Sequence, residues 1–266
     1  MAFEGVATSE DAVLGGQLIL RQPRRGHRFG HDAILLAAAA AASAGEHAVD
    51  LGAGVGTAGL ALARRVAGLA VTLLEIDSVL ANLAKQNTER NGLADRVRTV
   101  CLDVAAPGAD FTAAGLTAGS AHGVLMNPPF NAAANPSPEA RRRLAHSAAH
   151  DTLRQWTPTA SRLLRPNGVL TLIWRADGLG EVLDVLASSF GAIALLPVHP
   201  KPAAPAVRVL VRAVKASRAP LRLLPGLLLA DADGKPSEAA EAVLRGGAVL
   251  PLAEAPSSPR KPFRCP

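Results

Sequence analysis

The stretch Asp50-Leu51-Gly52-Ala53-Gly54-Val55-Gly56-Thr57 decides the fold of this 266-residue chain. A short apolar run, His47-Ala48-Val49, precedes it, and the helical pattern Ala58–Arg65 follows it. A strand, a glycine-rich turn and a helix in this order predict a site where the backbone can approach a ligand closely. The helix N-terminus adds free N–H groups and a favourable dipole at the same place.

The glycines of this loop fit two registers that predict different ligands. Gly54, Gly56 and Gly59 satisfy the Gly-x-Gly-x-x-Gly spacing of dinucleotide-binding folds, but that register begins two residues too late. Gly52 takes the position directly after the strand, and Asp50 places a negative charge just before it. A negative charge repels a pyrophosphate and attracts a methionine amino group or a sulfonium. The loop therefore predicts S-adenosylmethionine as the cofactor, and NAD as the disfavoured alternative.

A second motif, Asn127-Pro128-Pro129-Phe130, follows the apolar run Gly123–Met126. Such a run ending at two prolines predicts a buried strand that meets a loop. The prolines restrict the backbone there, so Asn127 should project its amide from the strand tip. The acceptors of Asn127 and Pro128, beside the flat ring of Phe130, suit a planar group that carries an exocyclic amine. A strand-ending turn with a core phenylalanine is the alternative, which the nearby cofactor loop disfavours.

Together the two motifs resemble the class I S-adenosylmethionine-dependent methyltransferases that alkylate amino nitrogens. Leu14–Leu18 followed by Gly30–Leu36 resembles the tRNA adenine-N6 methyltransferases that modify the anticodon loop of a valine tRNA. The resemblance covers most of residues 14–215 and departs at Asn131, where family members tend to carry a second aromatic residue. It implies an α/β, Rossmann-like class I methyltransferase fold, with a seven-stranded, mostly parallel sheet that has a terminal antiparallel strand.

The rest of the chain alternates between strand and helix patterns. We expect strands at residues 17–22, 47–51, 69–75, 97–102, 123–126 and 169–174, an antiparallel pair at 193–197 and 206–214, and helices at 32–42, 58–65, 78–91, 151–164 and 181–188. Residues 1–13 show no clear periodicity, and residues 105–120 are expected to be irregular. The predicted domains are an N-terminal strand and helix extension at 1–45, the methyltransferase domain at 46–215, and a small C-terminal appendage at 216–266 packed on the sheet. In this appendage we expect a small strand at 221–229 and a helix at 237–244.

Acidic residues at strand ends are the next candidates for the cofactor site. Glu75 lies about twenty residues past the glycine loop, where an acid can accept both ribose hydroxyls. Asp77 is expected to cap the helix at 78–91 instead. Asp103 follows the next strand; the resemblance implies that it holds the adenine amino group, and a surface-turn acid is the alternative. The resemblance also places Asp32 under the methionine end, a role compatible with an ordinary helix N-cap. The predicted cofactor-binding residues are Asp32, Asp50, Gly52, Ala53, Gly54, Gly56, Glu75, Ile76, Asp103, Val104 and Asn127.

The predicted reaction is direct methyl transfer to an adenine amine. This nitrogen is a poor nucleophile because its lone pair is conjugated with the ring. Asn127 and the Pro128 carbonyl would accept its two protons and turn the lone pair toward the methyl group. Phe130 would stack the base, which must leave its neighbours to enter the pocket. Asn127, Pro128 and Phe130 are thus the predicted catalytic residues, acting through positioning and preorganised acceptors rather than through a strong base.

The charge of the chain indicates an anionic partner. The formal net charge is +6, and a basic surface attracts phosphate backbones. The alternative is that the chain is rich in arginine and alanine because it is encoded in a GC-rich genome, and this explains the positive charge equally well. The predicted RNA-binding residues are Arg24, Arg25 and Arg28 in one loop and Arg141, Arg142 and Arg143 in the long polar stretch 131–150, for which a solvated charge run is the alternative. The expected partner is RNA, with tRNA as the favoured class.

Several protein classes are disfavoured by the sequence. No apolar run reaches eighteen residues, so we expect no membrane segment, and the N-terminus shows no secretory signal. Cys101 and Cys265 do not fit a metal spacing, so we expect no metal and a reducing, cytoplasmic setting. The oligomeric state is open.

Other substrates and other protein classes compete with the adenine prediction. Methylation of a protein glutamine, as in the release-factor methyltransferases, would use the same Asn-Pro-Pro sequence, but those enzymes carry a larger helical N-terminal domain. Methylation of guanine N2 in ribosomal RNA is a third enzyme reaction that the motif allows. A non-catalytic RNA-binding module is the alternative from another class, and the intact motif at Asn127 opposes it.

Overall fold

The computed structural model spans the whole chain and describes residues 7–24, 30–129 and 152–254. Five of the predicted RNA-binding arginines and one predicted catalytic residue lie outside the described residues: Arg25, Arg28, Arg141, Arg142, Arg143 and Phe130. Within the described residues, no helix is long and apolar enough to cross a membrane.

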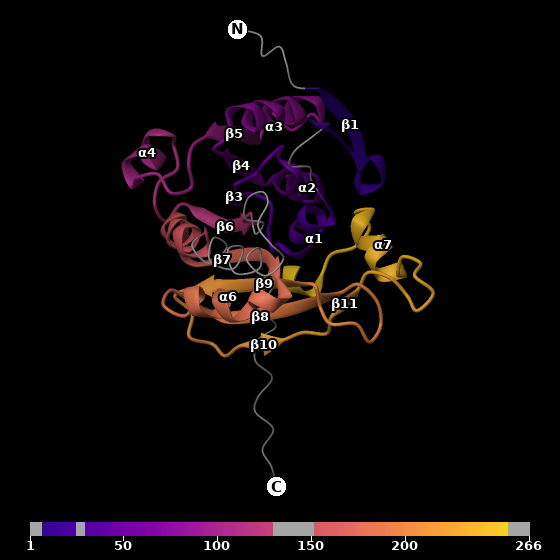
Figure 1. The fold of residues 1–266 in the computed structure, drawn as a ribbon. Helices are drawn as coiled ribbons and strands as arrows, with labels where there is room; N and C mark the ends of the chain where they lie inside the picture. Colours follow the sequence, from indigo (N-terminus) through magenta and orange to yellow (C-terminus); the bar gives the residue numbers. More distant parts are fainter. Residues whose placement is uncertain (1–6, 25–29, 130–151, 255–266) are drawn as a thin grey trace, which may run out of the picture.

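One large sheet organises the molecule, and its order is β5-β4-β3-β6-β7-β9-β8 (Figure 1). The strands are β3 (His47–Leu51), β4 (Ala70–Glu75), β5 (Val97–Cys101), β6 (Ala121–Met126), β7 (Leu164–Arg175), β8 (Phe190–His199) and β9 (Arg208–Lys215). Strand β9 is antiparallel to both β7 and β8, whereas β5, β4, β3, β6 and β7 are parallel. These seven strands confirm the predicted fold class and its terminal antiparallel strand.

Two short strands stand where the sequence predicted one small strand, at residues 221–229 and packed on the sheet. Strands β10 (Arg222–Leu223) and β11 (Leu227–Leu228) both pair in parallel with β8, which makes the sheet nine-stranded. Each has only two residues, too few to produce an alternating pattern. They therefore could not be recognised as separate strands from the sequence.

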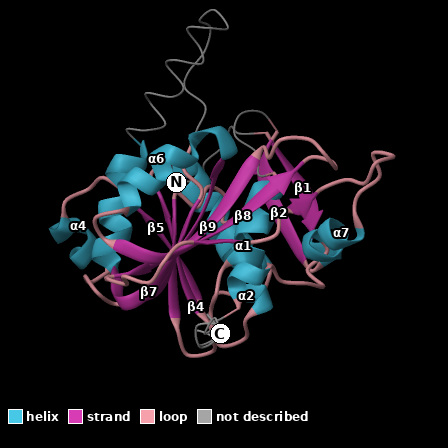
Figure 2. Cartoon of the chain, turned by 90° about the horizontal axis from the view of Figure 1, so that it is seen from below, coloured by secondary structure: helices cyan, strands magenta, loops and turns pink. Residues whose placement is uncertain are grey.

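Helices cover both faces of the sheet, and each face has its own apolar core (Figure 2). One face carries α1 (His31–Ala39), α2 (Thr57–Arg65) and α3 (Ser78–Arg90); the other carries α4 (Gly108–Ala113), the helix at residues 152–163, and α6 (Leu179–Leu186). Successive strand residues alternate between the two cores: Leu73 belongs to the first and Leu74 to the second. A parallel sheet buried in this way explains why its strands have apolar sequences.

The carboxyl ends of the parallel strands bring the predicted site residues to one edge of the sheet. Helix α2 starts at this edge, directly after β3, and ends at the opposite edge with Arg65. The Arg65 Nη2 donates to the Ala37 carbonyl at 3.2 Å and to the Ala40 carbonyl, so α1 ends beside the end of α2. Asp32 in the first turn of α1 bonds Arg208 of β9, which pairs with Arg175 at the carboxyl end of β7, so α1 begins at the carboxyl edge of the sheet.

The N-terminal segment is a hairpin of β1 (Thr8–Val13) and β2 (Leu18–Pro23), joined by the single turn η1 (Leu14–Gly16). Only its second strand was predicted; the absence of structure expected before residue 14 is wrong for residues 8–13. The side-chain amide of Asn87 in α3 pairs with both backbone polar groups of Arg21, as the backbone of a neighbouring strand does. Its Oδ1 accepts the Arg21 N–H at 2.7 Å, and its Nδ2 donates to the Arg21 carbonyl at 3.0 Å. The hairpin is thus bonded to the main body of the molecule.

The C-terminal part also contacts the main body. Helix α7 (Glu238–Leu244) packs beside α1 through Val243, and the Leu250 N–H donates to the Ala38 carbonyl at 2.9 Å. The buried Arg212 of β9 donates to the Leu252 carbonyl at 3.1 Å in η3 (Pro251–Ala253). Strands β10 and β11 lie at the sheet edge, while α7 lies against a helix. The division into three domains remains a prediction.

Candidate active site

The glycine loop after β3 has the backbone shape that its sequence requires. Gly52, Gly54 and Gly56 have φ values of 65°, 58° and 90°, in the left-handed region that L side chains rarely adopt. A Cβ at Gly56 would come 2.9 Å from the Leu73 Cδ1, whereas a Cβ at Gly54 would meet no atom within 4 Å. The loop is therefore packed against Leu73 at Gly56 and open at Gly54, where a ligand can approach the backbone. This opening fits the predicted cofactor.

Glu75, at the end of β4, holds the glycine loop in place. Its side chain is largely buried, with 6% exposed; its Oε2 accepts the Gly54 N–H at 2.7 Å and its Oε1 accepts the Asp77 N–H at 2.9 Å. A carboxylate has about four lone-pair sites, so two remain for the hydroxyls of a ribose. Ile76 next to it is 61% exposed and offers an apolar surface to a flat ring. Asp77 caps α3, as predicted, by accepting the Val79 N–H at 2.8 Å.

Asp103 and Val104 follow β5, at the same edge. The Asp103 Oδ1 accepts the Ala105 N–H at 2.9 Å, the bond of an ordinary turn aspartate, while the residue is exposed. This geometry is compatible with both roles that the sequence left open. Val104 has a buried side chain and its carbonyl accepts the Thr159 hydroxyl at 2.9 Å. Any contact of Val104 with a cofactor therefore falls to its backbone N–H.

Asp50 is the buried acid of the loop. It is 2% exposed, and its Oδ2 accepts the Gly59 N–H at 2.8 Å in the first turns of α2. Burial raises the pKa of Asp50 to about 7; the Gly59 N–H opposes this shift, and the charge of Glu75 adds to it. The ionised form of Asp50 is therefore disfavoured in the protein alone, and a cation bound nearby would stabilise it. This supports the predicted preference for a methionine amino group or a sulfonium.

Asn127 stands at the tip of β6, beside Gly52. Met126 pairs with Leu51 across the two parallel strands, so the residues that follow them are neighbours. The Asn127 Oδ1 is buried and has no hydrogen-bond partner among the described residues. Leaving a buried acceptor without a hydrogen bond destabilises the folded protein by about 1–3 kcal/mol. Such an acceptor in a native site therefore indicates a position where a ligand can supply the donor. Pro128 beside it is buried and Pro129 is exposed.

Asp32 makes a long-range ion pair that the sequence did not predict. The N-cap of α1 is Gly30 and Asp32 lies in the first turn, so the alternative of an ordinary N-cap does not hold for Asp32; its place near the methionine end stays a prediction. Its Oδ2 lies 2.8 Å from the Nε of Arg208 at the start of β9, and the side chains are 25% and 29% exposed. The partners are 176 residues apart in the sequence, and no local pattern links them.

Trp156 is a second site residue that the sequence reasoning missed. A Cβ at Gly52 would come 2.2 Å from the Trp156 Cη2, so the indole edge occupies the place that a side chain at position 52 would take. The indole is partly buried and packs on the core formed by the helix at residues 152–163. The sequence did contain a hint that Trp156 matters for the site. It is one of two tryptophans in a chain with 3% aromatic residues, and it lies in the helix that follows the Asn-Pro-Pro motif.

Arg24 is the one predicted RNA-binding arginine within the described residues. It is exposed, and its Nε donates to the Thr8 carbonyl at 2.9 Å, which ties it to β1. Its backbone N–H donates to the Ala7 carbonyl at 2.8 Å. Arg24 therefore continues the hairpin, on a surface that an RNA backbone can reach.

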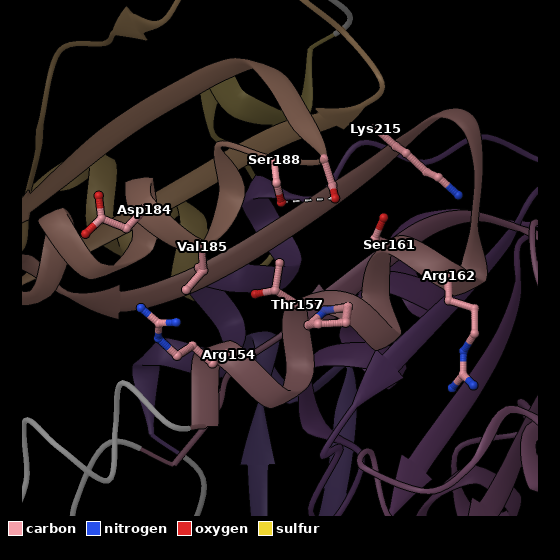
Figure 3. A pocket seen from close by; sticks show the side chains of 10 residues that line it. Arg154, Thr157, Ser161, Arg162, Asp184, Val185, Ser188 and Lys215 are labelled. Atoms are coloured by element: carbon pink, nitrogen blue, oxygen red, sulfur yellow. Dashed lines mark hydrogen bonds between the residues drawn. The ribbon is translucent and has the colours of Figure 1, made fainter.

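A polar cavity of about 560 Å³ lies between the helix at residues 152–163 and α6, away from the predicted site (Figure 3). Two of its cations are engaged: Lys215 donates to the Leu164 carbonyl at 2.6 Å, and Arg162 lies 4.4 Å from the centre of the Phe111 ring. None of the predicted site residues lines it, so it is not the reaction cleft. The lining residues are Arg154, Thr157, Pro158, Ser161, Arg162, Asp184, Val185, Ser188, Ser189 and Lys215.

Among residues 7–24, 30–129 and 152–254, no three His, Cys, Asp or Glu side chains gather closely enough to hold a metal ion.

Comparison with known proteins decides the family. The family described as "Methyltransferase small domain" matches residues 29–201. The chain belongs to this family. The match spans the glycine loop, Glu75, Asp103 and Asn127, which are the residues that the structure gathers at the carboxyl edge of the sheet.

Relatives with assigned activities act on two kinds of target. The chain is 31% identical over 160 residues to the tRNA1(Val) (adenine(37)-N6)-methyltransferase of Porphyromonas gingivalis, covering 58% of this chain and 61% of that protein. It is 28% identical to the enzyme of the same name from Bacteroides fragilis, covering 69% and 76%. It is 29% identical to the release factor glutamine methyltransferase of Chlorobaculum tepidum, covering 58% and 53%. The matches thus span between about half and three quarters of these relatives.

Solved structures agree with the family. A predicted O-methyltransferase from Agrobacterium tumefaciens superposes with a TM-score of 0.71 and 29% identity, covering 82% of this chain and 98% of that one. An S-adenosylmethionine-dependent O-methyltransferase from Thermotoga maritima, at 18% identity and a TM-score of 0.51, shares the fold. The chain therefore carries an S-adenosylmethionine-dependent methyltransferase domain, which confirms the predicted enzyme class and cofactor. The target of methylation is not decided by these matches, because the relatives differ in it.

Proposed function

We propose that this methyltransferase modifies the exocyclic amine of adenine in RNA, with tRNA as the favoured class. The observation that carries the proposal is the buried Asn127 Oδ1, which has no partner among the described residues and stands beside the glycine loop. An acceptor that is desolvated and preorganised before the substrate arrives suits a donor that must be oriented during the reaction.

The arrangement activates an amine without a strong base. When bound, S-adenosylmethionine supplies an electrophilic methyl group. Asn127 Oδ1 accepts a hydrogen bond from one N–H of the amine and the Pro128 carbonyl accepts one from the other, which turns the nitrogen lone pair out of conjugation. The nitrogen would take the methyl group as the bond from that methyl to the cofactor sulfur breaks, so that the positive charge passes from sulfur to nitrogen, and the nitrogen would then lose one proton to water. Phe130, whose structure is not described, is proposed to stack the base.

Two observations support RNA over protein as the substrate. The chain has a formal net charge of +6, suited to a phosphate backbone. The relative from Bacteroides fragilis, matched over 76% of its length, is named as a tRNA methyltransferase. A protein glutamine is the second candidate, because its planar amide would present the same two protons to Asn127 and Pro128.

The basic stretch Arg24, Arg25 and Arg28 is proposed to hold the RNA backbone. Arginine presents a planar donor fork suited to phosphate, and such contacts position an RNA without reading its sequence. Replacing all three with glutamate should raise the apparent KM for RNA and reduce the log–log salt slope by roughly 0.7–0.9 per lost contact. Unchanged RNA affinity and slope would transfer the role to Arg141, Arg142 and Arg143.

Product analysis tests the proposed target directly. The protein is incubated with methyl-labelled S-adenosylmethionine and, in separate reactions, total tRNA, ribosomal RNA and a release-factor protein. Nucleosides and amino acids are then separated. We expect label in N6-methyladenine from tRNA, and none with Asn127→Ala. Label in guanine or in protein glutamine would overturn the adenine assignment while leaving the methyltransferase family intact.

A further inference from the structure

We propose that the Asp32–Arg208 ion pair receives the amino-acid end of the cofactor: Asp32 accepts hydrogen bonds from its ammonium group, and Arg208 donates to its carboxylate. Asp32 was expected near this end, but its partner Arg208 has no assigned role. The inference rests on S-adenosylmethionine as the cofactor and on the proposed placing of its ribose and methyl group. It does not depend on which amine is methylated.

The positions of the other site residues fix the direction in which this end must lie. The cofactor sulfur carries three substituents. Glu75 on β4 is placed for the ribose, and Asn127 on β6 marks the side toward which the methyl group must point. Strand β3 lies between them, and neighbouring strands are about 4.8 Å apart. The third substituent, the amino-acid chain, must therefore leave toward one of the two faces of the sheet.

One of the two faces is already filled. The Trp156 indole packs on Gly52 from the face that carries the helix at residues 152–163, where a Cβ at position 52 would meet it at 2.2 Å. The other face carries α2 and α1, and α1 begins at the carboxyl edge with Asp32 in its first turn. The open direction for the amino-acid chain thus leads to the ion pair.

The chemistry of the pair matches this end of the cofactor. The amino-acid end is a zwitterion with no net charge, and the pair likewise carries one charge of each sign. The Arg208 guanidinium forms a planar donor fork that suits a carboxylate, and its Nη1 also donates to the Val207 carbonyl at 3.0 Å, which orients it. The side chains of Asp32 and Arg208 remain 25% and 29% exposed, so a ligand can reach both. A partly exposed ion pair contributes little to folding stability, so stability alone does not explain why this pair is present.

Two ligands that differ only at this end provide the test. S-adenosylhomocysteine carries the amino-acid chain, whereas 5′-methylthioadenosine has the same adenosine and sulfur without it. Calorimetry gives the Kd of each for the wild type, Arg208→Gln and Asp32→Asn. We expect both variants to bind S-adenosylhomocysteine on the order of 10-fold more weakly, the effect of losing a hydrogen bond to a charged group. Binding of 5′-methylthioadenosine should stay within about twofold, because it makes no contact with the pair.

A matched control comes from Arg245, which is ion-paired with Glu241 at 3.4 Å on α7 and is 70% exposed. Arg245→Gln should leave both affinities unchanged, and thermal melting confirms that all variants fold. Equal weakening of the two ligands in Arg208→Gln would mean that the pair only supports the fold, and would overturn the proposal. Unchanged binding of S-adenosylhomocysteine would overturn it as well. Neither ligand is a sulfonium that can donate a methyl group, so these results are independent of whether adenine is the target.

Discussion

The tips of β3 and β4 differ from the tip of β6 in how their polar groups are satisfied. At β3 and β4, both oxygens of Glu75 accept backbone N–H groups, and Asp50 accepts the Gly59 N–H. At β6, the buried Asn127 Oδ1 has no partner among the described residues. The acids proposed to bind the cofactor are thus already held by backbone donors, whereas the acceptor proposed for the target amine has none among the described residues. These two parts of the proposed site are its completed side and its open side.

The largest expected effect comes from the open side of this comparison. Asn127→Ala should lower kcat by a factor on the order of 10²–10³, because it removes an acceptor whose bond strengthens in the transition state. Cofactor affinity should stay within a few-fold, since the glycine loop and Glu75 are untouched. Single-turnover rates and calorimetry measure the two quantities on the same preparation. Near-normal turnover would remove Asn127 from the catalytic assignment.

A smaller effect is expected on the completed side. Glu75→Ala should weaken S-adenosylmethionine binding by ~1.5–3 kcal/mol, the range for hydrogen bonds to a charged group. It also removes the acceptor for Gly54, which loosens the loop. Glu238→Ala in the first turn of the distant helix α7 serves as the control and should bind normally. If calorimetry finds unchanged affinity for Glu75→Ala, the ribose role moves to Asp77 or to neither residue.

The smallest effect is a fraction of a proton released on binding. Burial raises the pKa of Asp50 to about 7 in the protein alone, so near pH 7 the carboxyl is partly protonated. A cationic ligand nearby favours the carboxylate, lowers its pKa and expels the proton. Calorimetry of S-adenosylmethionine binding in two buffers of different ionisation enthalpy measures this release. The release should be at most about half a proton at pH 7, grow as the pH falls below 7 toward the lowered pKa of the complex, vanish by about two pH units above 7, and be absent in Asp50→Asn. Equal release by the wild type and Asp50→Asn would assign the proton to another group.

Local patterns were enough to predict several parts of the site. The strand, the glycines and the helix at residues 47–65 form a contiguous unit, so its sequence shows both the turn geometry and the preference against pyrophosphate. Asp77 was recognised as a helix cap because a cap bonds the N–H groups two and three residues ahead. In each case the interacting groups are close in sequence.

Other elements escaped prediction because their partners are distant or their sequences are short. Strand β1 has the polar sequence Thr8–Val13 and is held by pairing with β2. Helix α4 lies in a stretch expected to be irregular, and one buried side chain, Phe111, anchors it to the core. The same reason explains why Trp156 was overlooked, since its contact with Gly52 crosses from one helix to the loop of another unit.

The sequence by itself determined the chemistry that this protein can carry: a glycine loop with a buried acid, and an asparagine fixed before two prolines. These features depend on backbone conformations that a few adjacent residues impose. The tertiary structure alone decided which polar groups remain unpaired and which distant charges meet. It leaves Asn127 Oδ1 buried without a described partner and brings Arg208 to Asp32, because burial and long-range contacts arise only when separate strands and helices pack together.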